Sequence, residues 1–247
     1  MNAGLRAALS PMRRPCGSLR LSVMGETCVL RCSGALWLPD HSTLVAGDLH
    51  LEKGSAFAAR GQMLPPYDSR ATLDRLAAEI AELDPGVVIL LGDSFHDSRA
   101  IGRMAGDDRA RLDLLAQGRD WLWIEGNHDR RALEQADMAG LPGRVVGHLS
   151  VGALSLTHEP SPAPWPGEVA GHLHPAVRIV GHGRSVRRPC FVTDGRRLLL
   201  PAFGVFTGGL NVRDPAVAGL FETPPLIAAL GRDRVHAVAW DKAAAGR

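Results

Sequence analysis

Short apolar runs that end in glycine and a polar residue recur along this chain, and they constrain its fold more than any other feature. The three clearest runs are residues 43–46 before Gly47-Asp48, residues 87–91 before Gly92-Asp93, and residues 121–124 ahead of Gly126-Asn127. Continuous apolar runs predict strands that are covered on both faces. Loops converge at the carboxyl ends of such strands, and sites form there. We therefore expect the polar residues of these motifs to gather at one edge of an open α/β sheet.

The first half of the chain alternates between predicted strands and helices. Apolar residues recur at helical spacing over residues 69–83 and 107–117, and Asp68 or Ser69 can cap the first of these helices. Residues 130–138 are predicted to form a further helix. Residues 19–24 and 27–31 flank Gly25-Glu26 and predict an antiparallel hairpin, which residues 35–38 extend.

The second half is predicted to consist mostly of short strands with tight turns between them. The predicted strands are residues 145–149, 153–156, 169–170, 176–180, 189–192, 197–200 and 234–240. Two mixed sheets packed face to face, with helices outside, satisfy both halves of the chain. The predicted fold class is therefore α/β.

Length and composition fit one domain without a membrane span. The 247 residues are ample for a hydrophobic core, and we expect a single domain over residues 18–247 after a disordered leader over residues 1–17. No apolar run reaches the roughly 18 residues of a membrane span, so a cytoplasmic location follows by default. The formal net charge of +2 is too small to indicate a nucleic-acid partner by itself.

Side chains that suit divalent metals occupy the glycine-led motifs and the loops that follow them. The seven predicted ligands are Asp48, His50, Asp93, Asn127, His158, His172 and His174. Oxygen and imidazole donors without thiolate suit Mn²⁺, Fe or Zn²⁺ better than Ca²⁺ or Cu⁺. Each motif alone has an ordinary structural explanation, such as a turn or a helix cap. Their occurrence together and in this order predicts two metal ions, with the central Asp93 bridging them.

Two adjacent cations predict phosphoester hydrolysis. Such a pair activates water near neutral pH and neutralises charge on phosphoryl oxygens. His128 is the predicted catalytic residue, placed to bind a phosphate oxygen or to protonate the leaving alkoxide, and Asp129 is predicted to fix its tautomer. His96 is predicted to line the same pocket as a substrate contact.

These motifs resemble the pattern of the calcineurin-like metallophosphoesterase superfamily, over about residues 44–201. The matching motifs are Asp48-x-His50, Gly92-Asp93, Gly126-Asn127-His128-Asp129, a lone His158, and Gly171-His172-x-His174. The resemblance implies a four-layer α/β/β/α sandwich of two mixed sheets. It also implies two divalent ions, with Mn²⁺ expected and Fe or Zn as alternatives. One ion would be held by Asp48, His50 and His174, and the other by Asn127, His158 and His172, with Asp93 between them.

One departure from the superfamily pattern follows the second motif. Many relatives carry an aspartate or an asparagine a few positions after Gly92-Asp93, where this chain has His96-Asp97. The departure leaves the metal ligands unchanged, but it alters the expected contacts around them.

A narrower resemblance concerns the residues that flank the first motifs. Residues 47–54, 59–61, 64–68 and 92–97 resemble the ligase-associated DNA damage-response endonuclease family, PdeM. This resemblance implies a bacterial DNA-repair nuclease. Its implied functional associates are an ATP-dependent DNA ligase and a helicase.

An arginine strip follows the last ligand motif and fits a DNA substrate. It consists of Arg178, Arg184, Arg187, Arg188, Arg196 and Arg197, with Asp194 as the one acid between them. Arg187 and Arg188 are the predicted substrate-binding residues, because a basic strip beside metals can follow a phosphate backbone. The alternative is a solvated, arginine-rich hairpin. Nothing after residue 201 is long enough for a large capping domain, so an open site and a single-stranded or flexible DNA substrate are expected.

Two other functions fit parts of the same pattern. A phosphatase or pyrophosphohydrolase that acts on nucleotides or small phosphorylated metabolites would use the same ligands. A metal-free relative that serves as a binding scaffold is the third possibility. The complete ligand set argues against the scaffold, because a scaffold has no need of all seven residues.

Overall fold

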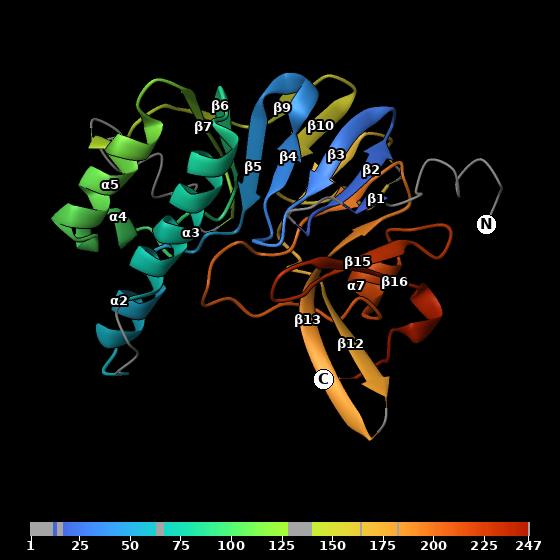
Figure 1. Cartoon of the computed structure of the whole chain (residues 1–247). Helices are drawn as coiled ribbons and strands as arrows, with labels where there is room; N and C mark the ends of the chain where they lie inside the picture. The colour runs from blue at the N-terminus through green and yellow to red at the C-terminus, as the bar shows by residue number, and fades with distance from the viewer. Residues whose placement is uncertain are drawn as a thin grey trace.

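Two β-sheets packed face to face form the centre of the molecule, as the computed structural model shows (Figure 1). The structure describes residues 17–62, 67–127, 140–163, 165–181 and 183–246, together with the backbone of residues 12–13. The predicted helix over residues 130–138 lies outside the described residues. So does most of the predicted leader, apart from β1 (Met12–Arg13) and Gly17.

The first sheet contains eight strands in the order of the sequence. After β1, these are β2 (Leu19–Val23), β3 (Glu26–Leu30), β4 (Leu36–Leu38), β5 (Thr43–Gly47), β6 (Val87–Leu91), β7 (Asp120–Ile124) and β8 (Arg144–Val146). β1 to β5 pair in antiparallel fashion, and β5 to β8 are parallel. β5, β6 and β7 are the continuous apolar runs of the sequence, because both of their faces are buried, whereas β8 is partly exposed.

The second sheet is mixed and comes from the second half of the chain. Its strands are β9 (Leu149–Val151), β10 (Leu154–Thr157), β11 (Glu168–Ala170), β12 (Ala176–Gly181), β13 (Arg184–Thr193), β14 (Leu198–Leu199), β15 (Leu226–Leu230) and β16 (Val235–Val238). β10, β11 and β14 are parallel, whereas the other pairs are antiparallel. β12 pairs only with β13, and this hairpin projects beyond the sandwich (Figure 1).

Helices cover the outer face of the first sheet and, more thinly, that of the second. The first sheet carries α2 (Lys53–Ala58), α3 (Asp68–Leu83), α4 (Ala100–Arg103) and α5 (Gly106–Ala116). The second sheet carries α7 (Pro215–Ala218) and the 3₁₀ turn η3 (Trp240–Lys242); another 3₁₀ turn, η1 (Pro39–His41), precedes β5. The predicted α/β class with two mixed sheets and outer helices is confirmed.

Three apolar clusters hold these layers together. One fills the space between the two sheets, with Phe191 and Leu156 of the second sheet packed among residues of the first. Another joins the first sheet to its helices around Trp123, and the last joins the second sheet to α7 around Val217. In the described part of the chain, no helix is long and apolar enough to cross a membrane.

Several elements differ from the sequence predictions. Residues 145–149 form the ends of two strands, because the chain turns at Gly147-His148 between β8 and β9. β13 has ten residues rather than four, and its first half is exposed and rich in arginine, so no apolar pattern marks it. The predicted cap of α3 is also wrong. Asp68 accepts a hydrogen bond from the Gly54 amide at 3.0 Å, and Ser69 bonds Glu52, so both residues tie α3 to α2 instead.

Candidate two-metal site

Five loops converge where parallel strands of both sheets end. In the first sheet, β5 ends at Asp48, β6 runs through Gly92 to Asp93, and β7 leads to Asn127. In the second sheet, β10 ends at His158 and β11 runs through Gly171 to His172, two residues before His174. All strands involved are parallel within their own sheet, so their carboxyl ends meet at one edge.

The predicted ligands themselves hold an unusual backbone conformation. Positive φ angles occur at Asp48 (56°), His50 (46°), Asp93 (44°), His172 (64°) and His174 (45°). A residue with a Cβ rarely adopts this region, and each instance costs on the order of 1–3 kcal/mol. Backbone hydrogen bonds maintain it: the Asp48 amide donates to Gly92 O at 3.1 Å, and the His50 amide donates to Asp93 O at 2.9 Å. Such strain gathers at functional sites, where the surrounding structure holds it in place.

Glycine is required at two positions because the loops approach one another closely. A Cβ on Gly126 would lie 2.1 Å from the Asp93 amide nitrogen and 2.4 Å from Oδ1 of the same residue. A Cβ on Gly171 would lie 2.4 Å from Asp48 Oδ2. All three distances are far inside van der Waals contact, so no larger residue fits without moving a carboxylate of the site.

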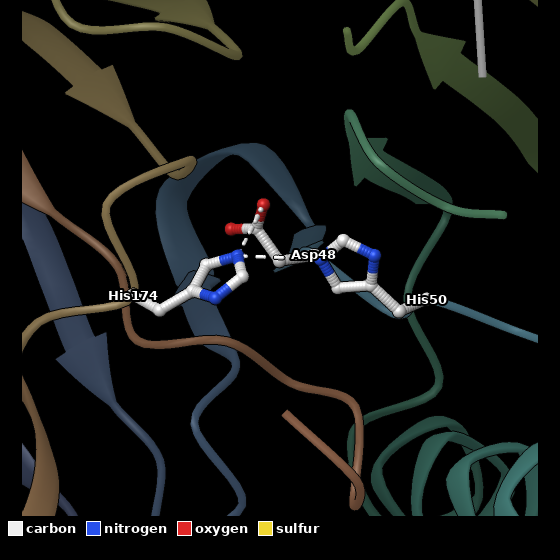
Figure 2. A group of neighbouring side chains, drawn as sticks. All are labelled: Asp48, His50 and His174. Carbon is white, nitrogen blue, oxygen red and sulfur yellow. Dashed lines mark hydrogen bonds and ion pairs between the residues drawn. The ribbon is translucent and has the colours of Figure 1, made fainter. Parts of the chain in front are cut away.

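The first group of side chains consists of Asp48, His50 and His174 (Figure 2). His174 Nε2 lies 3.0 Å from Asp48 Oδ1 and 3.4 Å from His50 Nε2. The carboxylate is fully buried, and the His50 ring is 7% exposed. Two imidazole nitrogens and a carboxylate oxygen that point at one another are all electron-pair donors. Only protons or a cation between them make this arrangement favourable.

The second group consists of Asp93, His158 and His172. His158 Nε2 lies 3.4 Å from Asp93 Oδ2, and His172 Nδ1 lies 3.2 Å from His158 Nε2. The opposite nitrogen of the His158 ring, Nδ1, lies 3.3 Å from Leu91 O. A proton on Nδ1 that is donated to this carbonyl leaves Nε2 as the free electron pair, aimed into the group.

The two groups are neighbours, because residues of the second group contact Asp48 of the first. The backbone amide of His172 donates to both oxygens of this carboxylate, at 3.2 and 3.0 Å. His158 Nδ1 is 3.8 Å from Asp48 Oδ1. The edge therefore holds two adjacent sets of donors rather than two unrelated clusters.

The pKa of His158 reflects the negative charge of the carboxylates around it. Burial of this ring by itself lowers its pKa, but the hydrogen bond with Asp93 and the negative charges of Asp48 and Asp93 outweigh burial and raise the pKa to about 9. Without a cation, the histidine therefore carries a proton that balances two buried carboxylates. Metal binding would replace that proton by a stronger positive charge.

The donor set fits a pair of divalent metal ions. Each group offers one carboxylate and two imidazoles from residues whose ligand atoms all lie within 4.8 Å of one another. This mixture, without thiolate, suits Mn, Fe or Zn ions. The glycines at 126 and 171 leave room for the Asp93 and Asp48 carboxylates, which an added Cβ would meet.

The remaining predicted site residues are placed in different ways. Asn127 ends the described part of its loop with an exposed side chain, directly after the glycine that packs on Asp93. His128 and Asp129 lie outside the described residues. His96 does lie at the site: its ring centroid is 6.1 Å from that of His50 and 6.0 Å from that of Phe57, on which it stacks.

The arginine strip does not form one continuous surface. Arg197 is buried and pairs with Glu168 at 2.7 Å, so it belongs to the core of the second sheet. Arg196 lies at the turn beyond β13, at the opposite end of that strand from Arg184. Arg187 and Arg188 are consecutive on β13, and consecutive side chains of a strand point to opposite faces. They accordingly line two different grooves.

Sequence reasoning missed part of the support of the site. The turn that begins at Gly204 contacts the site, because the Gly204 amide donates to Asp48 O at 3.2 Å. Arg75 holds this turn by donating to Phe203 O at 2.7 Å. Glu52, which is buried and has a positive φ, bonds Ser69 at 2.8 Å and thereby fixes the chain just after His50. The alternation of polar residues at 48, 50 and 52 was the available signal for Glu52.

The fold and the site together define a class of protein. An α/β sandwich that brings carboxylates and imidazoles from two sheets into adjacent groups is the framework of a metal-dependent phosphoester hydrolase. The family model described as calcineurin-like phosphoesterase matches residues 41–187, more than half of the chain, and the chain belongs to this family. The family uses a two-metal centre. No curated protein matches the chain.

Solved structures are also similar to this chain. The Pseudomonas putida nuclease MPE is 30% identical, with a TM-score of 0.68, and the match covers 90% of this chain and 100% of that one. The phosphoesterase Yfce from E. coli is 17% identical, and the match covers 81% of this chain and 94% of that one. Its TM-score of 0.40 is too low to support any conclusion.

Proposed function

We propose that this protein is a two-metal phosphodiesterase that cleaves DNA as an endonuclease. The observation that carries the proposal is the pair of adjacent donor groups, in which the His172 amide of one group donates to Asp48 of the other. The similarity to a nuclease over nine-tenths of the chain supports a nucleic-acid substrate. The expected DNA is single-stranded or flexible.

Each site residue receives a role in this proposal. Asp48, His50 and His174 would hold one cation, and His158, His172 and Asn127 would hold the other, with Asp93 between them. The bound pair would supply an activated water and neutralise charge on the phosphoryl group.

Other side chains would handle the substrate itself. We assign His128 to protonating the leaving alkoxide and Asp129 to holding the tautomer that this transfer needs. His96, which stands beside His50, would donate a hydrogen bond to a phosphoryl oxygen. The proton from His128 would go to the leaving oxygen as the bond between that oxygen and phosphorus breaks.

The biological setting extends the proposal further. The sequence motifs that resemble the PdeM family support a role in DNA repair, with Mn²⁺ as the metal and a cytoplasmic location. They also support a functional association with an ATP-dependent DNA ligase and a helicase.

Two variants test the proposed mechanism. Asp93→Asn removes a buried charge from the second donor group, so it should lose bound metal and activity together. His128→Ala should keep its metal and lose activity by roughly 10²–10⁴-fold, the usual contribution of a general acid. The measurements are metal content after gentle purification, and turnover of single-stranded DNA with added Mn²⁺.

A substrate panel separates the proposal from its alternatives. Single-stranded DNA and a bis-aryl phosphodiester should both be hydrolysed faster than an aryl phosphomonoester. Strong monoester turnover with inert DNA would indicate a phosphatase or pyrophosphohydrolase instead. A protein that purifies without Mn, Fe or Zn, and that stays inactive when these metals are added, would be the scaffold.

A further inference from the structure

A groove of about 590 Å³ lies between α3, the loop after β3, the hairpin strand β13 and the end of β15. Three arginines line it: Arg75 from α3, Arg188 from β13 and Arg232 after β15. Its other described lining residues are Cys32, Ser33, Pro189, Leu230 and Gly231, and none of the described residues that line it is acidic. Three cationic side chains from separate parts of the chain therefore face one space.

None of these arginines is neutralised within the described part of the chain. Two other arginines that are near groove residues in the sequence do have acidic partners. Arg31 pairs with Glu79 and Glu82, and Arg234 lies 3.6 Å from Asp233. Arg75 donates to a carbonyl and has no carboxylate partner in that part, and burial lowers its pKa. Gathering unpaired cations is unfavourable unless an anion joins them, and guanidinium groups match phosphate oxygens in charge and geometry.

Two short connections link the groove to the edge of the sheets that holds the donor groups. Arg75 holds Phe203 O, and the neighbouring amides of Phe203 and Gly204 donate to Gly47 O and Asp48 O at 2.8 and 3.2 Å. Arg188 pairs with Val177, three residues beyond His174. Three residues span at most about 11 Å and paired strands lie about 5 Å apart, so the Cα atoms of Arg188 and His174 lie within about 16 Å.

A separation of at most about 16 Å is within the reach of a few nucleotides. A nucleic-acid strand carries one phosphate for about every 3.4 Å of a stacked helix. A strand whose scissile phosphate sits at the metal pair could therefore place a phosphate a few nucleotides away in the groove. A dinucleotide without terminal phosphates carries only the scissile phosphate, so it has no second phosphate to place in the groove.

We propose that Arg188 and Arg232, with Arg75 behind them, form a phosphate-binding subsite that holds the nucleic-acid strand a few nucleotides from the cleaved bond. The inference rests on the proposed function and adds residues that determine substrate length. The contact with the phosphate backbone of the nucleic acid is thereby assigned to the face of β13 that carries Arg188. Arg187, on the opposite face, donates to Gly209 O at 2.5 Å and lies in a different groove.

The test compares charge-removing variants on a single-stranded oligonucleotide and on a dinucleotide, both with Mn²⁺. Arg188→Gln combined with Arg232→Gln should raise KM for the oligonucleotide on the order of tenfold near 0.1 M salt. The slope of log(kcat/KM) against log[salt] should become shallower by about 1.4, because each lost phosphate contact to a single strand removes about 0.7. Turnover of the dinucleotide should not change. Arg75 is left intact because it also supports the loop beside Asp48.

Arg187→Gln is the discriminating variant, since it removes the same charge one residue away on the other face. It should change the salt slope less than Arg188→Gln does. Equal effects of the two single variants, or an unchanged slope in the double variant, would overturn the subsite.

The outcomes also separate this inference from the proposed function. If wild-type protein cleaves the oligonucleotide and the double variant does so with unchanged KM and slope, only the subsite is lost. If wild-type protein hydrolyses neither DNA substrate, the proposed function fails first. An equal loss by the double variant on the dinucleotide would place these arginines in general support of the site, against the subsite.

Discussion

At the scale of single residues, the site depends on how closely backbone segments approach the ligands. Asp48, His50 and Asp93 all occupy the left-handed region of the backbone, each just after a buried strand. The glycines beside them, such as Gly126, leave room for a neighbouring carboxylate. The positions of the donors are therefore set by main-chain contacts as much as by the side chains that bind.

Gly126→Ala tests this dependence. Its Cβ would stand 2.1 Å from the Asp93 amide nitrogen, so Asp93 must shift, and a displacement of about 1 Å can cost on the order of a hundredfold in activity. Metal content and phosphodiester turnover measure the effect. Gly102→Ala in α4 is the matched control, because nothing lies within 4 Å of the added methyl group. Full activity and full metal content in Gly126→Ala would show that the contact is not limiting.

Residue-level prediction worked where a motif has one local meaning. The glycine-led motifs predicted the residues of both donor groups except the lone His158, because apolar runs that end in glycine mark the ends of buried parallel strands. The sequence did not distinguish Arg187, Arg188 and Arg197, which look equivalent in it. Their environments differ because strand alternation separates the first two, and pairing with Glu168 buries the third.

At the scale of elements, the long helix α3 joins the first sheet to the site. Its first residues bond α2 through Asp68 and Ser69, and Arg75 in its middle holds the turn at Gly204. Its last turns carry Glu79 and Glu82, which both pair with Arg31 at 2.6 Å. The amphipathic pattern predicted this helix within one residue of its observed start, but not these tertiary contacts, because they depend on loops distant in sequence.

The short helices and strand β15 were not predicted from the sequence, for a different reason. α2, α4 and α7 have four to six residues, too few for a helical period to emerge, and contacts with neighbouring elements stabilise them. β15 was missed although it is apolar, because it follows two prolines and lacks a polar motif at its end. Such elements are fixed by packing rather than by local pattern.

The Arg31 pairs give an element-scale prediction. Arg31 and Glu79 are both nearly buried, whereas the Glu82 side chain is 54% exposed. Glu79→Gln should lower the free energy of unfolding by about 3 kcal/mol, since it leaves a buried guanidinium with a weaker partner. Glu82→Gln should cost at most about 1 kcal/mol, because water screens that pair. Denaturant unfolding of both variants checks the difference, and equal costs would contradict the importance of burial.

At the scale of the whole molecule, the donor groups connect two sheets that are otherwise joined by an apolar core. Asp48, His50 and Asp93 extend from the first sheet, whereas His158, His172 and His174 extend from the second. Each group therefore combines ligands from both sheets. Asp48 and Asp93 are buried and carry like charge at this junction, so the folded state depends on the positive charge placed between them.

Metal removal should therefore destabilise the entire fold rather than the loops alone. A metal that binds only the folded state at about 100 times its Kd contributes about 2.7 kcal/mol. For a chain of this size, that loss corresponds to a fall in Tm of roughly 5–10 °C. Thermal unfolding with a chelator, and again after Mn²⁺ is restored, measures the effect. Asp93→Asn is the matched control and should respond little to the chelator, because it has already lost its metal. A wild-type Tm that is unchanged by chelation, while activity disappears and returns with Mn²⁺, would mean that the metals act only in catalysis and do not connect the two sheets.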